Sequence, residues 1–157
     1  MIVLVVDDDE NCSKLIAGFL VRLEPHWNPV EARSCNEAKT VLQERHDVDC
    51  VLIDHLMFGV LGTDCVKELR SVGYKGAIIL FSGHMDESIA IEAIKNGADD
   101  FLVKGNKLSK DLPKFIRSAV ERRMESKITS IDGEEKMKEL NALGNQLNKL
   151  EMQIRKK

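Results

Sequence analysis

Short apolar runs alternate with helix-patterned segments along the first 120 residues, and this alternation restricts the fold more than any other feature of the chain. Four runs have the continuous apolar character of strands covered on both faces, and a weaker one spans residues 30–33. Between them apolar residues recur at intervals of three and four, as in amphipathic helices. The pattern predicts an α/β fold with a doubly wound, five-stranded parallel sheet and helices on both faces. The strong runs are IVLVV (2–6), CVLID (50–54), AIILFS (77–82) and DFLV (100–103).

The carboxyl ends of these predicted strands carry side chains suited to phosphate chemistry. Asp7 and Asp8 follow the first strong run, Asp54 ends the second, Ser82 ends the third and Lys104 follows the fourth. In doubly wound sheets this edge holds the ligand site. Two carboxylates about 4 Å apart repel by about 4 kcal/mol at an effective dielectric constant of about 20, so the cluster requires solvent, hydrogen bonds or a cation. Mg²⁺ prefers such oxygen ligands, and we expect it here.

Four segments together resemble the receiver domain of two-component response regulators, including the stand-alone chemotaxis regulators. The resemblance covers about residues 1–122 and implies a flavodoxin-like sheet with strand order 2-1-3-4-5. It also implies a signalling switch that catalyses only its own phosphorylation and dephosphorylation. The segments, in order, are VLVVDDDEN, VLIDHLMFGVLG, ILFSG and GADDFLVKG.

The resemblance implies a role for each acidic residue of the predicted site. Asp54 would accept a phosphoryl group from a histidine kinase or a histidine phosphotransfer protein. Asp8, Asp54 and the backbone carbonyl of Leu56 would bind Mg²⁺ directly, and Asp7 would act through a coordinated water molecule. Asp9 matches no such role, and we interpret it as the solvated start of the first helix.

The resemblance also implies how phosphorylation is read. Lys104 would pair with phosphate oxygens, Ser82 would hydrogen-bond to the phosphoryl group, and Phe101 would turn inward on activation, remodelling a surface that binds a downstream protein target. Leu56 and His84 occupy the two positions that flank the path of the hydrolytic water. We interpret apolar Leu56 as an obstacle to that water, which predicts a long-lived phosphorylated form.

Three departures from the family pattern predict altered loops around the site. Phe58 stands where proline is usual, and Leu61 stands where an acidic residue is common before the next helix. Gly105 replaces the proline that usually follows the lysine, so the cis peptide of the family is not expected there. None of the three changes removes a catalytic atom.

Composition narrows the class of protein further. The net charge of −3 gives no reason to expect direct binding to nucleic acid, and no apolar run approaches the roughly 20 residues of a membrane span. We therefore expect a cytoplasmic protein without a membrane partner. The four cysteines form no CxxC pair, and we interpret them as buried free thiols rather than disulfides or metal ligands. They are Cys12, Cys35, Cys50 and Cys65.

Residues 123–157 form a charged, amphipathic segment that we expect to be a helical extension. Five apolar residues in it are spaced three and four apart, the pattern of a coiled-coil seam. They are Leu140, Leu143, Leu147, Leu150 and Ile154. The segment is either a short coiled coil that forms a homodimer or docks a partner, or a linker helix leading to more of a longer regulator.

Two other functions compete with the receiver interpretation. A haloacid-dehalogenase-like phosphohydrolase also uses an aspartate after its first strand, and Asp7 with Asp9 satisfies its D-x-D motif. Its lysine should however precede the later acidic pair, whereas Lys104 follows it, and Asp54 would have no task. The other alternative is a receiver-like dimerisation scaffold without phosphorylation. Such a scaffold has no need of the repulsive acidic pocket.

Overall fold

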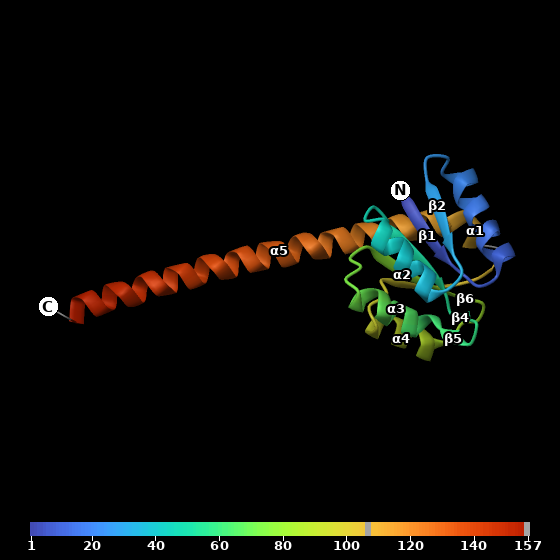
Figure 1. Cartoon of the computed structure of the whole chain (residues 1–157). Coiled ribbons are helices and arrows are strands. Elements are labelled where there is room, and N and C mark those ends of the chain that lie inside the picture. The colour runs from blue at the N-terminus through green and yellow to red at the C-terminus, as the bar shows by residue number, and fades with distance from the viewer. Residues whose placement is uncertain (106–107, 156–157) are drawn as a thin grey trace. The chain divides into compact units, whose positions relative to one another are not determined.

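Five parallel strands form the central sheet of the computed structural model, which describes residues 1–105 and 108–155, with the side chains of 108–109, 147–151 and 153–155 left aside. The sheet order is β2-β1-β3-β6-β7, and a small antiparallel hairpin, β4 with β5, follows β3. Counted along the sheet's own strands, this is the order 2-1-3-4-5, so the prediction of a flavodoxin-like fold is confirmed. Figure 1 shows the helices packed around the sheet.

Apart from the β4–β5 hairpin, strands and helices alternate along the described chain. The strands are β1 (Ile2–Val6), β2 (Asn28–Ala32), β3 (Cys50–Asp54), β4 (Leu56–Met57), β5 (Val60–Leu61), β6 (Ala77–Ser82) and β7 (Asp100–Val103). The helices are α1 (Glu10–Leu23), α2 (Cys35–Glu44), α3 (Gly62–Ser71), α4 (Glu87–Lys95) and α5 (Leu108–Arg155).

Two hydrophobic cores, one on each face of the sheet, hold the domain together. Leu4 of β1 faces the core that α2, α3 and α4 cover, whereas its neighbour Val5 faces the core of α1 and the first turns of α5. Successive residues of a strand point to opposite faces, so a strand between two cores must be apolar throughout. Burying one such side chain contributes about 1.5–3 kcal/mol. This explains the continuous apolar runs of the sequence.

A buried ion pair ties the amino ends of the strands to α3. The Arg70 guanidinium donates to Asp99 Oδ2 at 2.8 Å and to the carbonyl oxygens of Tyr74, Gly76 and Gly97. Asp99 Oδ2 also accepts the backbone N–H of Ile78, at the start of β6. Every charge in this network has a partner, so its desolvation is offset by hydrogen bonds.

The second strand begins earlier than the sequence predicts. Residues 30–33 were expected as the strand, but β2 starts at Asn28 and includes Pro29. Proline is tolerated because β2 is an edge strand, where one row of backbone groups needs no partner. Ser34 caps α2, and its side chain accepts the N–H of Glu37.

The prediction of four free thiols is wrong for one pair. Cys35, the first residue of α2, and Cys65, in the first turn of α3, form a disulfide with their Cα atoms 5.6 Å apart. The Cα separation suits a disulfide. Thirty positions separate the two cysteines in sequence, so only the packing of α2 beside α3 brings them together. Cys12 and Cys50 are free.

The chain divides into two units, Met1–Arg123 and Met124–Lys157. Within the second unit α5 continues as a helix, and Leu140 and Leu143 are exposed. The side chains of Leu147, Leu150 and Ile154, the rest of the predicted seam, lie outside the described residues. In the part of the chain that the structure describes, no helix is both long and apolar enough to cross a membrane.

Candidate functional site

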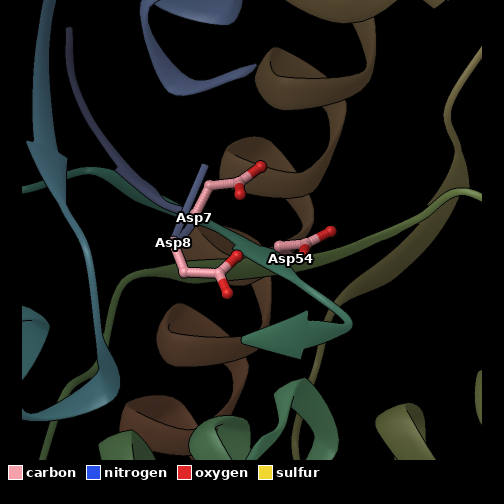
Figure 2. A group of neighbouring side chains, drawn as sticks. All are labelled: Asp7, Asp8 and Asp54. Atoms are coloured by element: carbon pink, nitrogen blue, oxygen red, sulfur yellow. The ribbon is translucent and has the colours of Figure 1, made fainter. Parts of the chain in front are cut away.

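Three carboxyl groups meet at the carboxyl edge of the sheet. Asp7 and Asp8 directly follow β1, and Asp54 is the last residue of the neighbouring strand β3 (Figure 2). One oxygen from each side chain lies within 4.8 Å of the others. Because β1 and β3 are adjacent and parallel, their ends must share this edge, as the sequence predicted.

Lys104 brings a positive charge to this cluster from the end of β7. Its Nζ lies 2.7 Å from Asp54 Oδ1 and 3.3 Å from Asp7 Oδ2. The ammonium also lies 5.3 Å from the centre of the Phe81 ring, a cation–π distance. Burial lowers the pKa of Lys104, but its hydrogen bond and charge interactions with Asp54 and Asp7 outweigh burial and raise the pKa. The lysine therefore stays charged.

The surroundings of Asp54 disfavour its negative charge. Burial raises the pKa of its carboxyl group, and the nearby charges of Asp7 and Asp8 raise it further, while the hydrogen bond and charge of Lys104 lower it. The net direction is upward, so the fold disfavours the carboxylate form. Such perturbation in a cluster of charges marks a candidate functional site.

The two remaining acids of the DDD run have separate tasks. Asp9 caps α1, and its side chain accepts the N–H groups of Asn11 and Cys12, which confirms its interpretation as the start of the first helix. Asp8 Oδ2 accepts the backbone N–H of Phe58 at 2.8 Å. This bond ties the end of β1 to the hairpin that follows Asp54.

The β4–β5 hairpin was not predicted. Its two loop residues have positive φ, 46° at Phe58 and 76° at Gly59, as a two-residue type I′ turn requires. Proline, with φ fixed near −65°, cannot take the place of Phe58 in this turn. Leu56 at the start of the hairpin is 57% exposed, and Phe58 is 73% exposed. Leu56 and Phe58, the latter standing where the family usually has proline, thus present exposed apolar side chains on the hairpin that follows Asp54.

Gly62, where the hairpin joins α3, packs directly on the strand end. Its N–H donates to the carbonyl of His55, and a Cβ there would meet the carbonyl oxygen of Asp54 and come within 2.9 Å of the His55 Cα. Only glycine allows this approach. The first turn of α3 is therefore in contact with the backbone of the site.

The remaining predicted residues lie at or near the same edge. Ser82 is buried at the end of β6, one residue beyond the partner of Asp54 in the sheet, and its Oγ accepts the N–H of His84 at 3.3 Å. His84 itself is exposed. Phe101 is half-buried on β7 against the core of α2, α3 and α4. Every described peptide bond is trans, including the one before Gly105.

Cys12 is a neighbour of the site that the sequence did not single out. Its Sγ lies 3.5 Å from Lys104 Nζ. Burial and a hydrogen bond with Asp7 raise the pKa of the thiol to about 11, so it remains neutral beside the ammonium. Its position one helical turn after the DDD run could have suggested it, but a lone cysteine carries no signal of its own.

The carboxylate oxygens that stay without a protein partner suit a hard cation. Asp54 Oδ1 is paired with Lys104, and Asp8 Oδ2 with the N–H of Phe58. Within the described residues, the other oxygen of each of these two carboxylates accepts no hydrogen bond. A divalent ion that prefers oxygen ligands would satisfy both of them and offset the repulsion.

A doubly wound parallel sheet whose carboxyl edge carries an acidic triad, a lysine and a hydroxyl defines the receiver class of signalling domains. The family model for the response regulator receiver domain matches residues 3–117, and the chain belongs to this family. Receiver domains are signalling switches rather than enzymes that act on other molecules. This assignment favours the receiver over the phosphohydrolase alternative.

Known proteins similar to the chain include regulators of different kinds. The transcriptional regulatory protein FixJ of Azorhizobium caulinodans is 36% identical over 100 residues, covering 64% of this chain and 46% of FixJ. The chemotaxis protein CheY of Bacillus subtilis is 32% identical over 103 residues, covering 65% of this chain and 83% of CheY. A receiver domain crystal structure from Clostridium thermocellum has a TM-score of 0.69 at 28% identity, covering 78% and 96% of the two chains. The chain spans about half the length of FixJ.

Proposed function

We propose that the chain is a Mg²⁺-dependent phosphoacceptor in which Asp54 receives a phosphoryl group from the phosphohistidine of a histidine kinase or a histidine phosphotransfer protein. The observation that carries this proposal is the position of Asp54 between a lysine 2.7 Å away and two further carboxylates. A carboxylate so placed has a cation on one side and unpaired oxygens on the other.

Transfer would proceed in line. One oxygen of the Asp54 carboxylate attacks phosphorus, the O–P bond forms, and the N–P bond to the donor histidine breaks, leaving the electron pair on the imidazole nitrogen. Bound Mg²⁺ supplies charge neutralisation on the phosphoryl oxygens. Asp8, Asp54 and the Leu56 carbonyl would hold it directly, and Asp7 through water. Lys104 would exchange its bond to Asp54 Oδ1 for one to a phosphoryl oxygen. These steps are catalysed by the chain on itself.

The phosphorylated state would be read through Ser82 and Phe101. The Ser82 hydroxyl, whose oxygen accepts the N–H of His84, would donate its hydrogen to the phosphoryl group. Phe101 would follow it inward and change the face made by α4, β7 and the start of α5, to which a downstream protein target binds. Both states pre-exist, and phosphorylation shifts their populations.

We place the receiver domain at residues 1–122 and a helical extension at 123–157, in a cytoplasmic protein. The exposure of Leu140 and Leu143 is compatible with a seam for a second copy of the chain. That this chain makes no direct contact with nucleic acid remains a prediction, since the relative named as a transcriptional regulatory protein is about twice as long as the matched region.

The proposal is tested by intact mass spectrometry after incubation with acetyl phosphate and Mg²⁺. Wild-type protein should gain one phosphoryl group, and Asp54→Ala should gain none. No gain in wild-type protein that remains folded would favour the scaffold alternative. A phosphoryl group that persists in Asp54→Ala but disappears in Asp7→Ala would favour the phosphohydrolase.

A further inference from the structure

We propose that Cys35 and Cys65 are a reversible redox site, and that its oxidation state sets how fast Asp54 is phosphorylated. The second half of this statement rests on the proposed function. The first half rests on the two cysteines alone, which form a disulfide between α2 and α3.

The pair lies in the core shared by α2, α3 and one face of the sheet. Cys65 is fully buried and Cys35 is 9% exposed. A single ion pair adjoins Cys35: Glu68 Oε2 lies 3.9 Å from its Sγ and 2.6 Å from Lys39 Nζ. Both charged side chains are partly exposed, so a rotation of the pair opens a path from solvent to Cys35 alone.

The chemistry follows from this difference in access. The Cys35 thiol, at the first residue of a helix, loses its proton and attacks one sulfur of a low-molecular-weight disulfide such as glutathione disulfide. A mixed disulfide forms and one glutathione leaves as a thiolate. Cys65 then loses its proton and attacks the Cys35 sulfur, which releases the second glutathione. Two electrons pass from the protein thiols to glutathione disulfide, and the two protons end on the two glutathione thiols.

Reduction changes the spacing of two helices. Sulfur atoms joined in a disulfide are about 2.05 Å apart, whereas non-bonded atoms of this size need roughly 3.5–4 Å. In a close-packed core the extra separation moves the elements that carry the two cysteines. Cys65 is in the first turn of α3, three residues after Gly62.

This first turn is in contact with the phosphorylation site. Gly62 donates its N–H to the His55 carbonyl and leaves no room for a Cβ against the Asp54 carbonyl. The neighbouring Thr63 carbonyl accepts a hydrogen bond from the Asn96 side chain at the end of α4. A displacement of α3 therefore reaches both Asp54 and the proposed switching face. Misplacement by about 1 Å can lower a rate by up to about a hundredfold.

The test uses wild-type protein equilibrated in glutathione buffers of different redox ratio. Acid quenching, denaturation and alkylation with N-ethylmaleimide, followed by intact mass measurement, counts the free thiols. We expect four alkylated cysteines in reduced glutathione and two in glutathione disulfide. Peptide mapping should assign the protected pair to Cys35 and Cys65. Four alkylated cysteines in every buffer would overturn the proposal.

The coupling is measured as the rate of phosphorylation by acetyl phosphate with Mg²⁺ in the two redox states. We expect the disulfide form to react at least about fivefold faster, since its α3 is held in place. Cys35→Ala/Cys65→Ala should react slowly in both buffers, whereas Cys50→Ala should respond like wild type. Equal rates for the two wild-type forms would overturn the coupling. Absence of phosphorylation in both forms would refute the proposed function and the coupling with it, while the thiol count still decides the redox site.

Discussion

Replacing Asp54 by asparagine is expected to make the protein more stable in the absence of Mg²⁺. Asparagine keeps the oxygen that accepts the hydrogen bond from Lys104 but carries no charge. The charge of Asp54 stabilises the folded state through its attraction to Lys104 and destabilises it through repulsion from the other carboxylates and through burial. The larger of these two effects decides whether Asp54→Asn raises or lowers the free energy of unfolding.

The distances give the size of each effect. At an effective dielectric constant of about 20, the attraction of Asp54 to Lys104 at 2.7 Å is about 6 kcal/mol. Repulsion from two carboxylates within 4.8 Å is at least about 3.5 kcal/mol each, or about 7 kcal/mol together. The charges thus nearly cancel, and the cost of burying the carboxylate decides the sign. We expect Asp54→Asn to raise the free energy of unfolding by about 1–2 kcal/mol at neutral pH.

The assay is urea unfolding in EDTA, followed by far-UV circular dichroism. The raised pKa of Asp54 fixes the pH dependence: its contribution to stability is fully present below the unfolded pKa, near 4, and is lost as pH rises through the folded value. The advantage of the variant should therefore be small near pH 4 and grow toward neutral pH. Mg²⁺ at ten times its Kd should cancel most of this advantage, since binding then stabilises wild type by about 1.4 kcal/mol.

The control is Asp47→Asn, which removes an exposed carboxylate paired with Arg45. The hydrogen bond from Arg45 lowers the pKa of Asp47, so this variant should show no gain in stability at any pH. The reasoning is refuted if Asp54→Asn unfolds at a lower urea concentration than wild type in EDTA at neutral pH.

Four further outcomes are expected from the structure. Gly62→Ala should lower the free energy of unfolding by about 1–3 kcal/mol, because the added Cβ meets the backbone of the strand end; Gly18→Ala, in an open helical position, should raise it by about 0.5–1 kcal/mol. Arg70→Met should lower it by about 1.5–3 kcal/mol in the same urea assay, because Asp99 loses its nearer cation and its hydrogen bond and keeps only Arg123, 3.7 Å away; a loss no larger than that of an exposed arginine variant would contradict this. Leu56→Asn should speed loss of the phosphoryl group about tenfold, the effect of about 1.4 kcal/mol from one hydrogen bond to the attacking water; an unchanged dephosphorylation rate by mass spectrometry would refute the tuning role of Leu56.

The sheet could be predicted from sequence because each central strand is buried on both faces. Such strands give runs like IVLVV and AIILFS. Because all five strands are parallel, the carboxyl ends of β1, β3 and the edge strand β7 bring Asp7, Asp54 and Lys104 to one edge. The edge strand β2 is covered less completely, and its first residues were accordingly missed. Its weaker apolar pattern left the boundary undetermined.

Other features depend on contacts that no local pattern encodes. The β4–β5 hairpin is only six residues long. Its turn has a positive φ at Phe58, and a phenylalanine does not indicate such a conformation. The disulfide depends on how α2 lies beside α3 in space. Neither helix period nor strand period carries that information.

The two ends of the sheet treat negative charge in opposite ways. At the amino ends, Asp99 accepts hydrogen bonds from Arg70 of α3 and from the backbone of β6, and so links α3 to the sheet. At the carboxyl ends, three carboxylates lie together, and Lys104 pairs with only two of them, Asp7 and Asp54. Negative charge is thus fully paired at the amino ends of the strands and only partly paired at their carboxyl ends. Loops at the carboxyl ends can therefore change their arrangement, or exchange one cation or anion for another. The interactions at the amino ends meanwhile keep the strands in position.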